Sequence, residues 1–308
     1  MILVTGGTGT IGRKLMACLA EKERRFRLLT LPGDTAAEEL AGDTCEIRYG
    51  DISDQESLKG ICQGVDTVFH LAAIILSPRE PEQFNRINVQ GTANLVAEAE
   101  HAGVQHFIHV SSASVCYGKQ NPYSVSKTRA EEMVRASRIP HWTVLRPTLA
   151  YEEGGSREFT HFVDYLKKYP VIPFIGTGRA TKAPVYVDDL VQGMAGAAGN
   201  AKAFGKTYGL SGGETLAIRQ MAEMLLVHMG RKKTIIPIPV FICRALALIS
   251  RGMSVLTGTE PLLTWQTISG IIQDADLNNA EAQTDLGFTP RGFSEGIKEL
   301  KSLQGCLT

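Results

Sequence analysis

The sequence predicts an α/β fold built on a doubly wound parallel sheet, and three observations support this prediction. Apolar strand-like runs alternate with helix-like runs through the first half of the chain. The strand-like runs are almost continuously apolar, which is typical of parallel strands covered on both faces. A glycine-rich stretch, "VTGGTGTIG" at residues 4–12, joins the first strand-like run to the first helix-like run. Strand, glycine turn and helix in this order open a sheet of this kind.

The elements of the first half follow from periodicity and turn residues. Strands are expected at residues 1–5, 26–31, 45–50, 67–73, 106–112 and 141–147. Helices are expected between them at residues 13–23, 54–62, 88–103 and 123–137. The helix at 88–103 ends at Gly103, a residue suited to a helix C-terminus.

The pattern loosens after Pro147. A loop and helix are expected at 151–170, a strand and helix at 183–200, and a short strand at 206–212, with a mostly helical remainder. We therefore expect a sheet domain at 1–150 to which residues 183–211 return. Residues 151–182 and 212–308 would form a smaller, mostly helical lobe that binds substrate.

Composition excludes several classes of protein. The 308 residues include 32 basic and 32 acidic side chains, so no global field points to nucleic acid. The six cysteines form no CxxC and no Cys/His cluster with metal spacing, so we expect reduced thiols, no metal and a cytoplasmic protein. The amino terminus "MILVTGG" has no signal-peptide pattern.

The most apolar late stretch is "TIIPIPVFICRALALIS", residues 234–250. It contains two prolines and an arginine and is shorter than the ~20 residues that cross a bilayer, so no transmembrane segment is predicted. A core or substrate-pocket helix is the favoured interpretation, and loose contact with a membrane surface is the alternative.

The glycine-rich turn indicates a dinucleotide site. Gly6, Gly9 and Gly12 have the spacing GxxGxxG, which permits a tight turn and a close backbone approach to a pyrophosphate. Thr10 and Ile11 begin the following helix, whose free N–H groups and dipole favour phosphate. Arg13 follows and could also contact phosphate.

A second motif stands at residues 111–127, "SSASVCYGKQNPYSVSK". Tyr123 and Lys127 are four residues apart and share a helix face whether or not they do chemistry. The pair therefore does not decide between a solvated helix start and a proton-transfer site. Its position downstream of a glycine turn and a serine-bearing strand favours proton transfer.

Together these motifs resemble the extended short-chain dehydrogenase/reductase superfamily, in its nucleotide-sugar epimerase/dehydratase-like branch. The resemblance covers nearly the whole chain and includes "YGDISD", "FHLAA", "NVQGT", "HVSSASV", "LRP", "VYVDD" and "DLGFTPR". It implies a Rossmann sheet with a C-terminal substrate lobe, an NAD or NADP cofactor, a small-molecule substrate and a possible homodimer.

The resemblance also implies roles for individual residues. Tyr123 would be the general acid/base, Lys127 would bind the nicotinamide ribose and lower the pKa of Tyr123, and Ser112 would steady the reacting oxygen. Ser111 is the less favoured serine. A free tyrosine has a pKa near 10. Acid/base catalysis near neutral pH therefore requires a pKa lowered by roughly 3 units, which corresponds to about 4 kcal/mol.

Further cofactor contacts are implied in the same way. Asp51 and Ile52 match positions beside the adenine, and Leu71, Ala72 and Ala73 would line the cofactor groove. The segment from Pro147 to Ala150 would contact the carboxamide. Thr30 stands where NAD-preferring members often carry an acid, so the choice between NAD and NADP stays open with a slight lean to NADP.

The sequence departs from the branch in several places. Only 11 positions separate Ser112 from Tyr123, and Ala113 and Ser114 replace the Asp-Glu pair that sugar dehydratases carry there. Lys182 and Arg179 stand near the place of a diphosphate-binding arginine. Some of the sequence motifs also resemble an atypical branch that includes the nucleotide-binding accessory subunit of respiratory complex I. Asp188 and Asp189 are expected to cap a helix starting at Leu190.

Three functions compete at this point. The leading hypothesis is an NAD(P)-dependent oxidoreductase or epimerase acting on a nucleotide-sugar or related hydroxyl or carbonyl substrate. The second is a cofactor-binding assembly or sensor protein without turnover. The third is a reductase of a hydrophobic ketone of steroid, terpenoid or quinone type. Phe159, Phe162, Phe241 and Leu246 could line a pocket for that substrate, although core packing is the favoured role for most of them.

Overall fold

The architecture comes from a computed structural model. It describes residues 1–21, 25–75, 80–153, 155, 157–257, 265–275 and 277–303.

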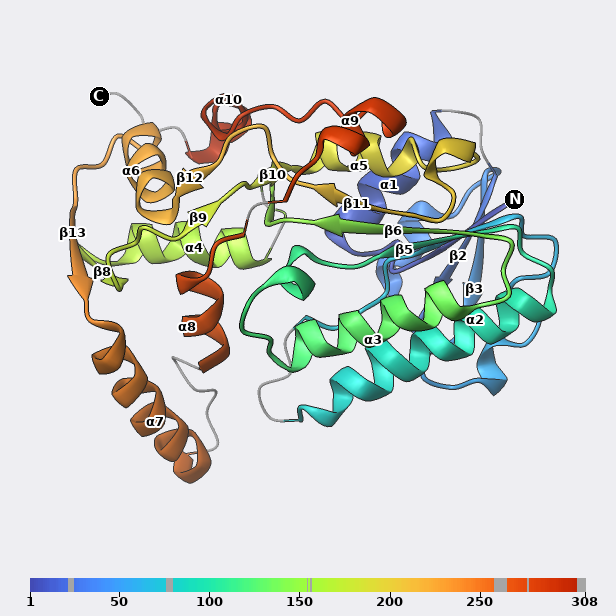
Figure 1. Cartoon of the computed structure of the whole chain (residues 1–308), viewed down its shortest axis with the longest axis horizontal. Coiled ribbons are helices and arrows are strands. Elements are labelled where there is room, and N and C mark those ends of the chain that lie inside the picture. Colours follow the sequence, from blue (N-terminus) through green and yellow to red (C-terminus); the bar gives the residue numbers. More distant parts are fainter. Residues whose placement is uncertain are drawn as a thin grey trace.

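A seven-stranded parallel sheet forms the centre of the molecule (Figure 1). Its strands lie in the order β11-β6-β5-β4-β1-β2-β3. Their bounds are β1 Ile2–Thr5, β2 Phe26–Thr30, β3 Cys45–Tyr49, β4 Thr67–His70, β5 His106–Val110, β6 His141–Pro147 and β11 Lys206–Leu210. The predicted doubly wound Rossmann sheet is confirmed, and each predicted strand of the first half is present.

The chain reverses its direction of winding beside β1. β1 pairs with β2 on one side, Ile2 with Phe26, and with β4 on the other, Ile2 with Thr67. Because all seven strands are parallel, their carboxyl ends lie along one edge of the sheet. The gap between the β1 and β4 ends is the topological switch point, where sheets of this class bind ligands.

Helices cover both faces of the sheet. α1 (Thr10–Ala20), α5 (Val187–Ala195) and α9 (Ala280–Leu286) pack on one face, over a core that includes Ile2 and Val4. α2 (Gly91–His101) and α3 (Pro122–Ala136) cover the other face, over a core that includes Leu3 and Phe107. Neighbouring residues of β1 therefore enter opposite cores, as strand geometry requires.

A second lobe has its own core, centred on Phe159, Leu166, Leu225 and Phe293. Its helices are α4 (Arg157–Lys168), α6 (Ile218–His228), α7 (Val240–Thr257), α8 (Trp265–Ile272) and α10 (Phe293–Gly296). Short two-stranded sheets connect it, formed by the pairs β7 (Ala150–Tyr151) and β10 (Val185–Tyr186), β9 (Thr181–Lys182) and β12 (Leu216–Ala217), and β8 (Val171–Ile175) and β13 (Thr234–Ile238). The division of the chain at residue 150 stays a prediction.

Several predicted elements differ in detail. The helix expected at 54–62 is a single 3₁₀ turn, Glu56–Leu58, and Gly60 beyond it has a positive φ that a helix does not accept. The helix expected at 88–103 begins with a π-helical turn, Phe84–Gln90. The expected cap at Asp188 and Asp189 is wrong, because α5 begins at Val187 and both carboxylates lie in its first turn.

The apolar stretch at 234–250 divides into strand β13 and the first part of helix α7. Among the described residues, the structure has no helix long and apolar enough to cross a membrane.

Candidate active site

The glycine-rich turn lies between β1 and α1 at the switch point. Gly6 has φ +71°, and a Cβ on it would lie 2.8 Å from the backbone nitrogen of Ala72 after β4. A Cβ on Gly12 would lie 2.2 Å from the carbonyl oxygen of Gly6. Only glycine fits at these two positions, so the turn stays flat and its backbone can be approached closely.

The amino end of α1 is left open by this turn. Gly9 is the N-cap and provides no side-chain hydrogen bond, and the first turn of α1 carries no acidic residue. The N–H groups of Thr10, Ile11 and Gly12 therefore have no side-chain acceptor at the cap, and the helix dipole adds positive potential. A flat turn followed by an uncapped helix fits the diphosphate of a dinucleotide.

An acidic residue beside this turn escaped the sequence reasoning. Asp34 follows β2 and accepts a hydrogen bond from the Thr30 hydroxyl at 2.6 Å. Hydrogen bonds from Thr30 and Thr8 hold the pKa of Asp34 below its ordinary value, so it is ionised at neutral pH. Position 30 itself carries no carboxylate, but one stands beside the Thr30 hydroxyl four residues later, on a loop whose course the strand pattern did not reveal.

Arg13 lies near the same acid but has its own partners. Its Nε donates to the carbonyl of Thr8 at 3.0 Å, and Nη1 pairs with Glu39 at 2.9 Å. The guanidinium therefore braces the glycine turn from outside.

The other predicted cofactor residues all follow strands at the same edge of the sheet. Asp51 and Ile52 follow β3, Leu71 to Ala73 follow β4, and Pro147 and Ala150 stand at the end of β6 and in β7. The Leu71 N–H donates to the Thr5 carbonyl and the Ala72 N–H to the Thr5 hydroxyl, which fixes the β4 end against the β1 end.

Local sequence places the Tyr and Lys on α3. Asn121 and Ser124 form a capping box, with Ser124 N donating to Asn121 Oδ1 at 2.9 Å, and Pro122 occupies the first turn. Tyr123 therefore lies in the first turn of α3 and Lys127 one turn later. Ser112 lies just after β5. Its side chain caps a 3₁₀ turn, Ala113–Cys116, by accepting a hydrogen bond from Ser114 N.

Tyr123 and Ser112 are brought together across this loop. Ser112 lies close enough to the Tyr123 phenol to affect it, and hydrogen bonding from Ser112 acts to lower the pKa of Tyr123. Burial acts more strongly and raises that pKa above its ordinary value, with Glu158 and Tyr117 adding to the rise. In this structure the pKa of Tyr123 thus moves opposite to the direction expected, and the phenol is protonated at neutral pH.

Lys127 is almost wholly enclosed, with 2 % of its surface exposed. Its Nζ donates to the carbonyl of Val110, at the end of β5, at 2.8 Å. Burial lowers the pKa of Lys127 to about 7, while the charge of Glu131 opposes that shift. The Lys127 ammonium is therefore held at the end of β5, which Ser111 and Ser112 follow in the sequence.

Glu131 is the charged side chain that acts on the pKa of Lys127. It is 1 % exposed and forms ion pairs with Arg146 at 2.6 Å and Arg135 at 2.7 Å. These two arginines hold the pKa of Glu131 below its ordinary value despite its burial. The i, i+4 spacings of Lys127, Glu131 and Arg135 were usable signals in the sequence, but Arg146 comes from β6 and needed the fold.

The loop that carries Ser112 is tied to the second lobe. Gln273, after α8, accepts from the backbone N–H of Lys119 at 2.6 Å and donates to its carbonyl at 3.1 Å. Lys182 is buried and donates to the carbonyls of Gly270 and Gln273 at 2.8 Å and 2.5 Å. Its Nζ lies 5.7 Å from the ring centroid of Tyr117. The Lys182 ammonium thus caps the carbonyl groups at the end of α8.

Glu158 is a further acid at this site that the sequence reasoning did not single out. It stands in the first turn of α4 and remains accessible, yet surrounding protein raises its pKa. Its charge acts on Tyr117 and Tyr123, so it faces the same space as the catalytic candidates.

The four apolar pocket candidates do not gather there. Phe159 and Phe162 belong to the core of the second lobe. Phe241 and Leu246 lie on the outer surface of α7, exposed by 71 % and 48 %. The core packing favoured for most of these residues is thus found for Phe159 and Phe162, whereas Phe241 and Leu246 face solvent on α7 and line no pocket with them.

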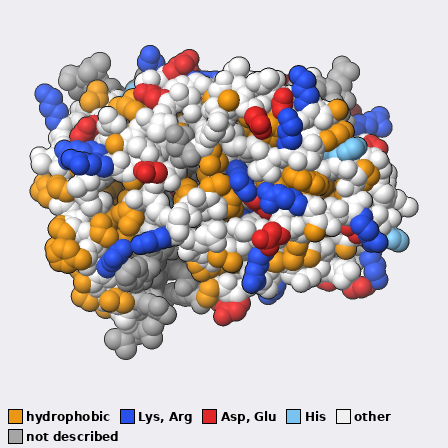
Figure 2. All heavy atoms as spheres, viewed as in Figure 1, with side chains coloured by type: hydrophobic (Ala, Val, Ile, Leu, Met, Phe, Trp, Pro, Cys, Tyr) orange, Lys and Arg blue, Asp and Glu red, His pale blue; other side chains and the backbone are white. Residues whose placement is uncertain are grey.

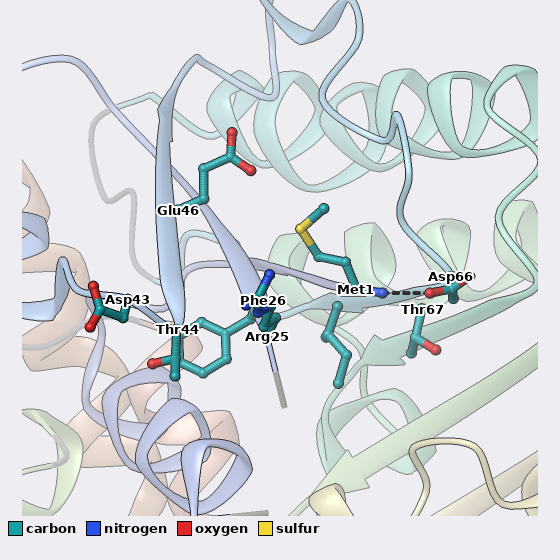
Figure 3. A pocket seen from close by; sticks show the side chains of 9 residues that line it. Met1, Arg25, Phe26, Asp43, Thr44, Glu46, Asp66 and Thr67 are labelled. Atoms are coloured by element: carbon teal, nitrogen blue, oxygen red, sulfur yellow. Dashed lines mark hydrogen bonds and ion pairs between the residues drawn. The ribbon is translucent and has the colours of Figure 1, made fainter. Parts of the chain in front are cut away.

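One hollow lies at the opposite edge of the sheet (Figure 3). It measures about 560 Å³ and is lined by residues that include Met1, Arg25, Asp43 and Asp66. Met1 and Asp66 form an ion pair across one side of it. It lies at the amino ends of the strands, away from the edge where parallel sheets bind ligands.

Comparison with known proteins agrees with this arrangement. Residues 2–210 match the model of the NAD dependent epimerase/dehydratase family, and this range contains the glycine turn, Ser112, Tyr123 and Lys127.

The chain belongs to the NAD dependent epimerase/dehydratase family.

Curated members of this family resemble the chain over nearly its full length. A 4-hydroxy-2-methyl-3-oxo-4-farnesyl-3,4-dihydroquinoline-1-oxide ketoreductase of Stigmatella aurantiaca is 26 % identical, over 97 % of this chain and 95 % of its own. A 3-beta-hydroxysteroid dehydrogenase of Mycolicibacterium neoaurum is 26 % identical, over 94 % and 87 %.

Among solved structures, a double mutant of DesIV, a dTDP-glucose 4,6-dehydratase from Streptomyces venezuelae, has NAD bound. It superposes with a TM-score of 0.77 over 98 % of this chain and 96 % of its own, at 23 % identity. This likeness shows the fold. The family match and the named relatives together make the chain an NAD(P)-dependent enzyme of the extended short-chain dehydrogenase/reductase superfamily.

Proposed function

We propose that this enzyme interconverts a ketone and a secondary alcohol on a hydrophobic small molecule, with Tyr123 as the acid/base. The observation that carries the proposal is the position of Tyr123 beside Ser112, one helical turn from Lys127, whose buried Nζ is held at the carboxyl end of β5. The nicotinamide cofactor, when bound, donates or accepts the hydride.

Each residue of the chain has a separate task in this proposal. Ser112 would hold the substrate oxygen beside the Tyr123 hydroxyl. Burial keeps the Tyr123 phenol protonated, so it can give its proton to a carbonyl oxygen during reduction and take it back during oxidation. Lys127 would hold the nicotinamide ribose.

One observation argues against a nucleotide-sugar substrate, and a second argues against a sugar dehydratase. The charge of Lys182 is used by the α8 carbonyls, so it is badly placed to bind a diphosphate. Ala113 and Ser114 provide no acid for the elimination of water. The two curated relatives described above, a ketoreductase and a steroid dehydrogenase, agree with this choice. The nucleotide-sugar epimerase remains the competing prediction.

We further propose NAD(H) as the cofactor. The sequence leaned to NADP because position 30 lacks an acid, but the Asp34 carboxylate lies within hydrogen-bonding distance of Thr30 beside the glycine turn. There it can accept from the adenosine ribose hydroxyls and would repel a 2′-phosphate. We expect at least about tenfold tighter binding of NAD than NADP, and Asp34→Ala to remove most of that preference. Tighter binding of NADP by the unmodified protein would contradict this assignment.

The catalytic proposal is tested by steady-state kinetics with NADH and a set of hydrophobic ketones, against UDP- and dTDP-sugars. Tyr123→Phe is expected to lower kcat by at least about 100-fold and to leave cofactor affinity unchanged. Tyr169→Phe, at an exposed tyrosine just after α4, is the control and should stay within about threefold. Full activity in Tyr123→Phe would refute the proposed role. Turnover of nucleotide-sugars alone would refute the proposed substrate class.

A further inference from the structure

Helix α7 has an inverted arrangement of side chains. Its larger apolar residues face solvent, with Phe241 exposed by 71 % and Leu248 and Ile249 by 60 % each. Leu246 is half exposed. Among the α7 side chains that the structure describes, the buried ones are small, Cys243 and Ala247, and they pack against Ile268 of α8. A helix on the surface of a globular protein normally buries its larger apolar residues, so this orientation calls for a partner.

The apolar surface continues onto the two-stranded sheet that precedes α7. Ile236 of β13 pairs with Pro173 of β8, and both side chains face outward with Val171. Figure 2 shows hydrophobic side chains gathered over β8, β13 and α7 on the left of the molecule, with basic side chains between them. We call this region, formed by the outer faces of α7, β8 and β13, the α7 surface.

The charge of the surrounding sequence identifies the partner. Residues 224–259 contain five basic side chains and no Asp or Glu, in a chain whose total charges balance. The basic residues are Arg231, Lys232, Lys233, Arg244 and Arg251. A helix with an apolar face in a basic setting is the pattern of segments that lie in the interface of an anionic membrane.

We propose that the α7 surface docks onto an anionic lipid bilayer, with α7 lying in the plane of the headgroups. A second copy of the chain fits the surface less well. A twofold interface would place the same basic segment of both copies against each other, and no acidic residue between 224 and 259 offsets it. Docking does not depend on which substrate the enzyme uses.

The test is co-sedimentation of the full chain with vesicles. One set is phosphatidylcholine alone, and the other contains about 30 % phosphatidylglycerol. We expect binding to the anionic vesicles at low salt, at least about tenfold weaker binding to the neutral vesicles, and progressive release as salt screens the charges.

Three variants locate the contact. Leu248→Ser combined with Ile249→Ser should weaken binding at least about tenfold, and Lys232→Glu should weaken it at low salt. Tyr49→Ser removes a comparably exposed ring from β3, far from α7 in Figure 1, and should bind like the unmodified protein. These side chains are exposed, so the variants are expected to fold, which circular dichroism checks.

Three outcomes would overturn the proposal: no binding to anionic vesicles, equal binding by the double variant, or equal binding to neutral vesicles. A fourth result would reassign the surface. If light scattering shows a dimer that the double substitution dissociates, and vesicles do not bind, the α7 surface joins two copies of the chain.

Discussion

Replacing Lys127 by Met should change how stability depends on pH. In the folded protein burial lowers the pKa of Lys127 to about 7, from an ordinary value of 10.5. The unfolded chain therefore binds a proton at this site between those two values while the folded protein does not. Because the unfolded chain binds more protons than the folded protein, the free energy of unfolding rises with pH across this range. Met has a similar shape and no charge, so the variant lacks this contribution.

The size of the effect follows from linkage. A shift of this magnitude corresponds to about 4 kcal/mol of destabilisation near neutral pH, and roughly half of it remains at about pH 9. The difference in unfolding free energy between the two proteins should change by about 2 kcal/mol between about pH 7 and about pH 9. Loss of the hydrogen bond to Val110 adds an offset that does not depend on pH.

The assay is urea unfolding of both proteins, without cofactor, at several pH values. The variant should be favoured relative to the unmodified protein at neutral pH, and that relative gain should shrink as pH rises. Lys202→Met, at an exposed lysine, is the control and should show a constant difference. A constant difference for Lys127→Met as well would refute the inference that burial holds its pKa near neutrality.

Three other predictions follow from particular contacts. Gly12→Ala should weaken NAD binding at least about 100-fold in calorimetry, because its Cβ would meet the Gly6 carbonyl, whereas Gly118→Ala has open space and should bind normally. Burial lowers the pKa of His70 to about 3 and of His106 to about 4, and that of His109 falls well below its ordinary value, so unfolding should become easier as pH drops below about 6.5. Neither ring nitrogen of His109 has a hydrogen-bond partner among the described residues. His109→Leu should therefore reduce the loss of unfolding free energy in acid by about 2 kcal/mol at about pH 5. A pH profile of the urea midpoint that the substitution leaves unchanged would contradict this prediction. Glu158→Gln should move the Tyr123 limb of the pH–rate profile to lower pH, because the Glu158 charge raises the pKa of Tyr123; Glu132→Gln, exposed on α3, should leave the limb in place.

Local patterns in the sequence were sufficient for the sheet and its edge. Continuous apolar runs give buried parallel strands, and the carboxyl ends of such strands must share one edge. The glycine turn, Ser112 and Tyr123 each follow or adjoin one of those ends, so their approximate meeting place was predictable before any coordinates. The helix expected at 123–137 likewise agrees with α3, which begins one residue earlier, at Pro122.

Contacts between distant segments depended on the tertiary structure. Asp34 reaches Thr30 through the course of a loop, and Glu131 pairs with Arg146 from a different element. The direction of the Tyr123 pKa depends on how much protein surrounds the phenol, which no spacing reveals. The outward orientation of α7 is the clearest case: its apolar sequence is compatible with a core helix. Only the packing of small Cys243 and Ala247 against α8 turns Phe241, Leu248 and Ile249 toward solvent, because close helix approach selects the smallest side chains.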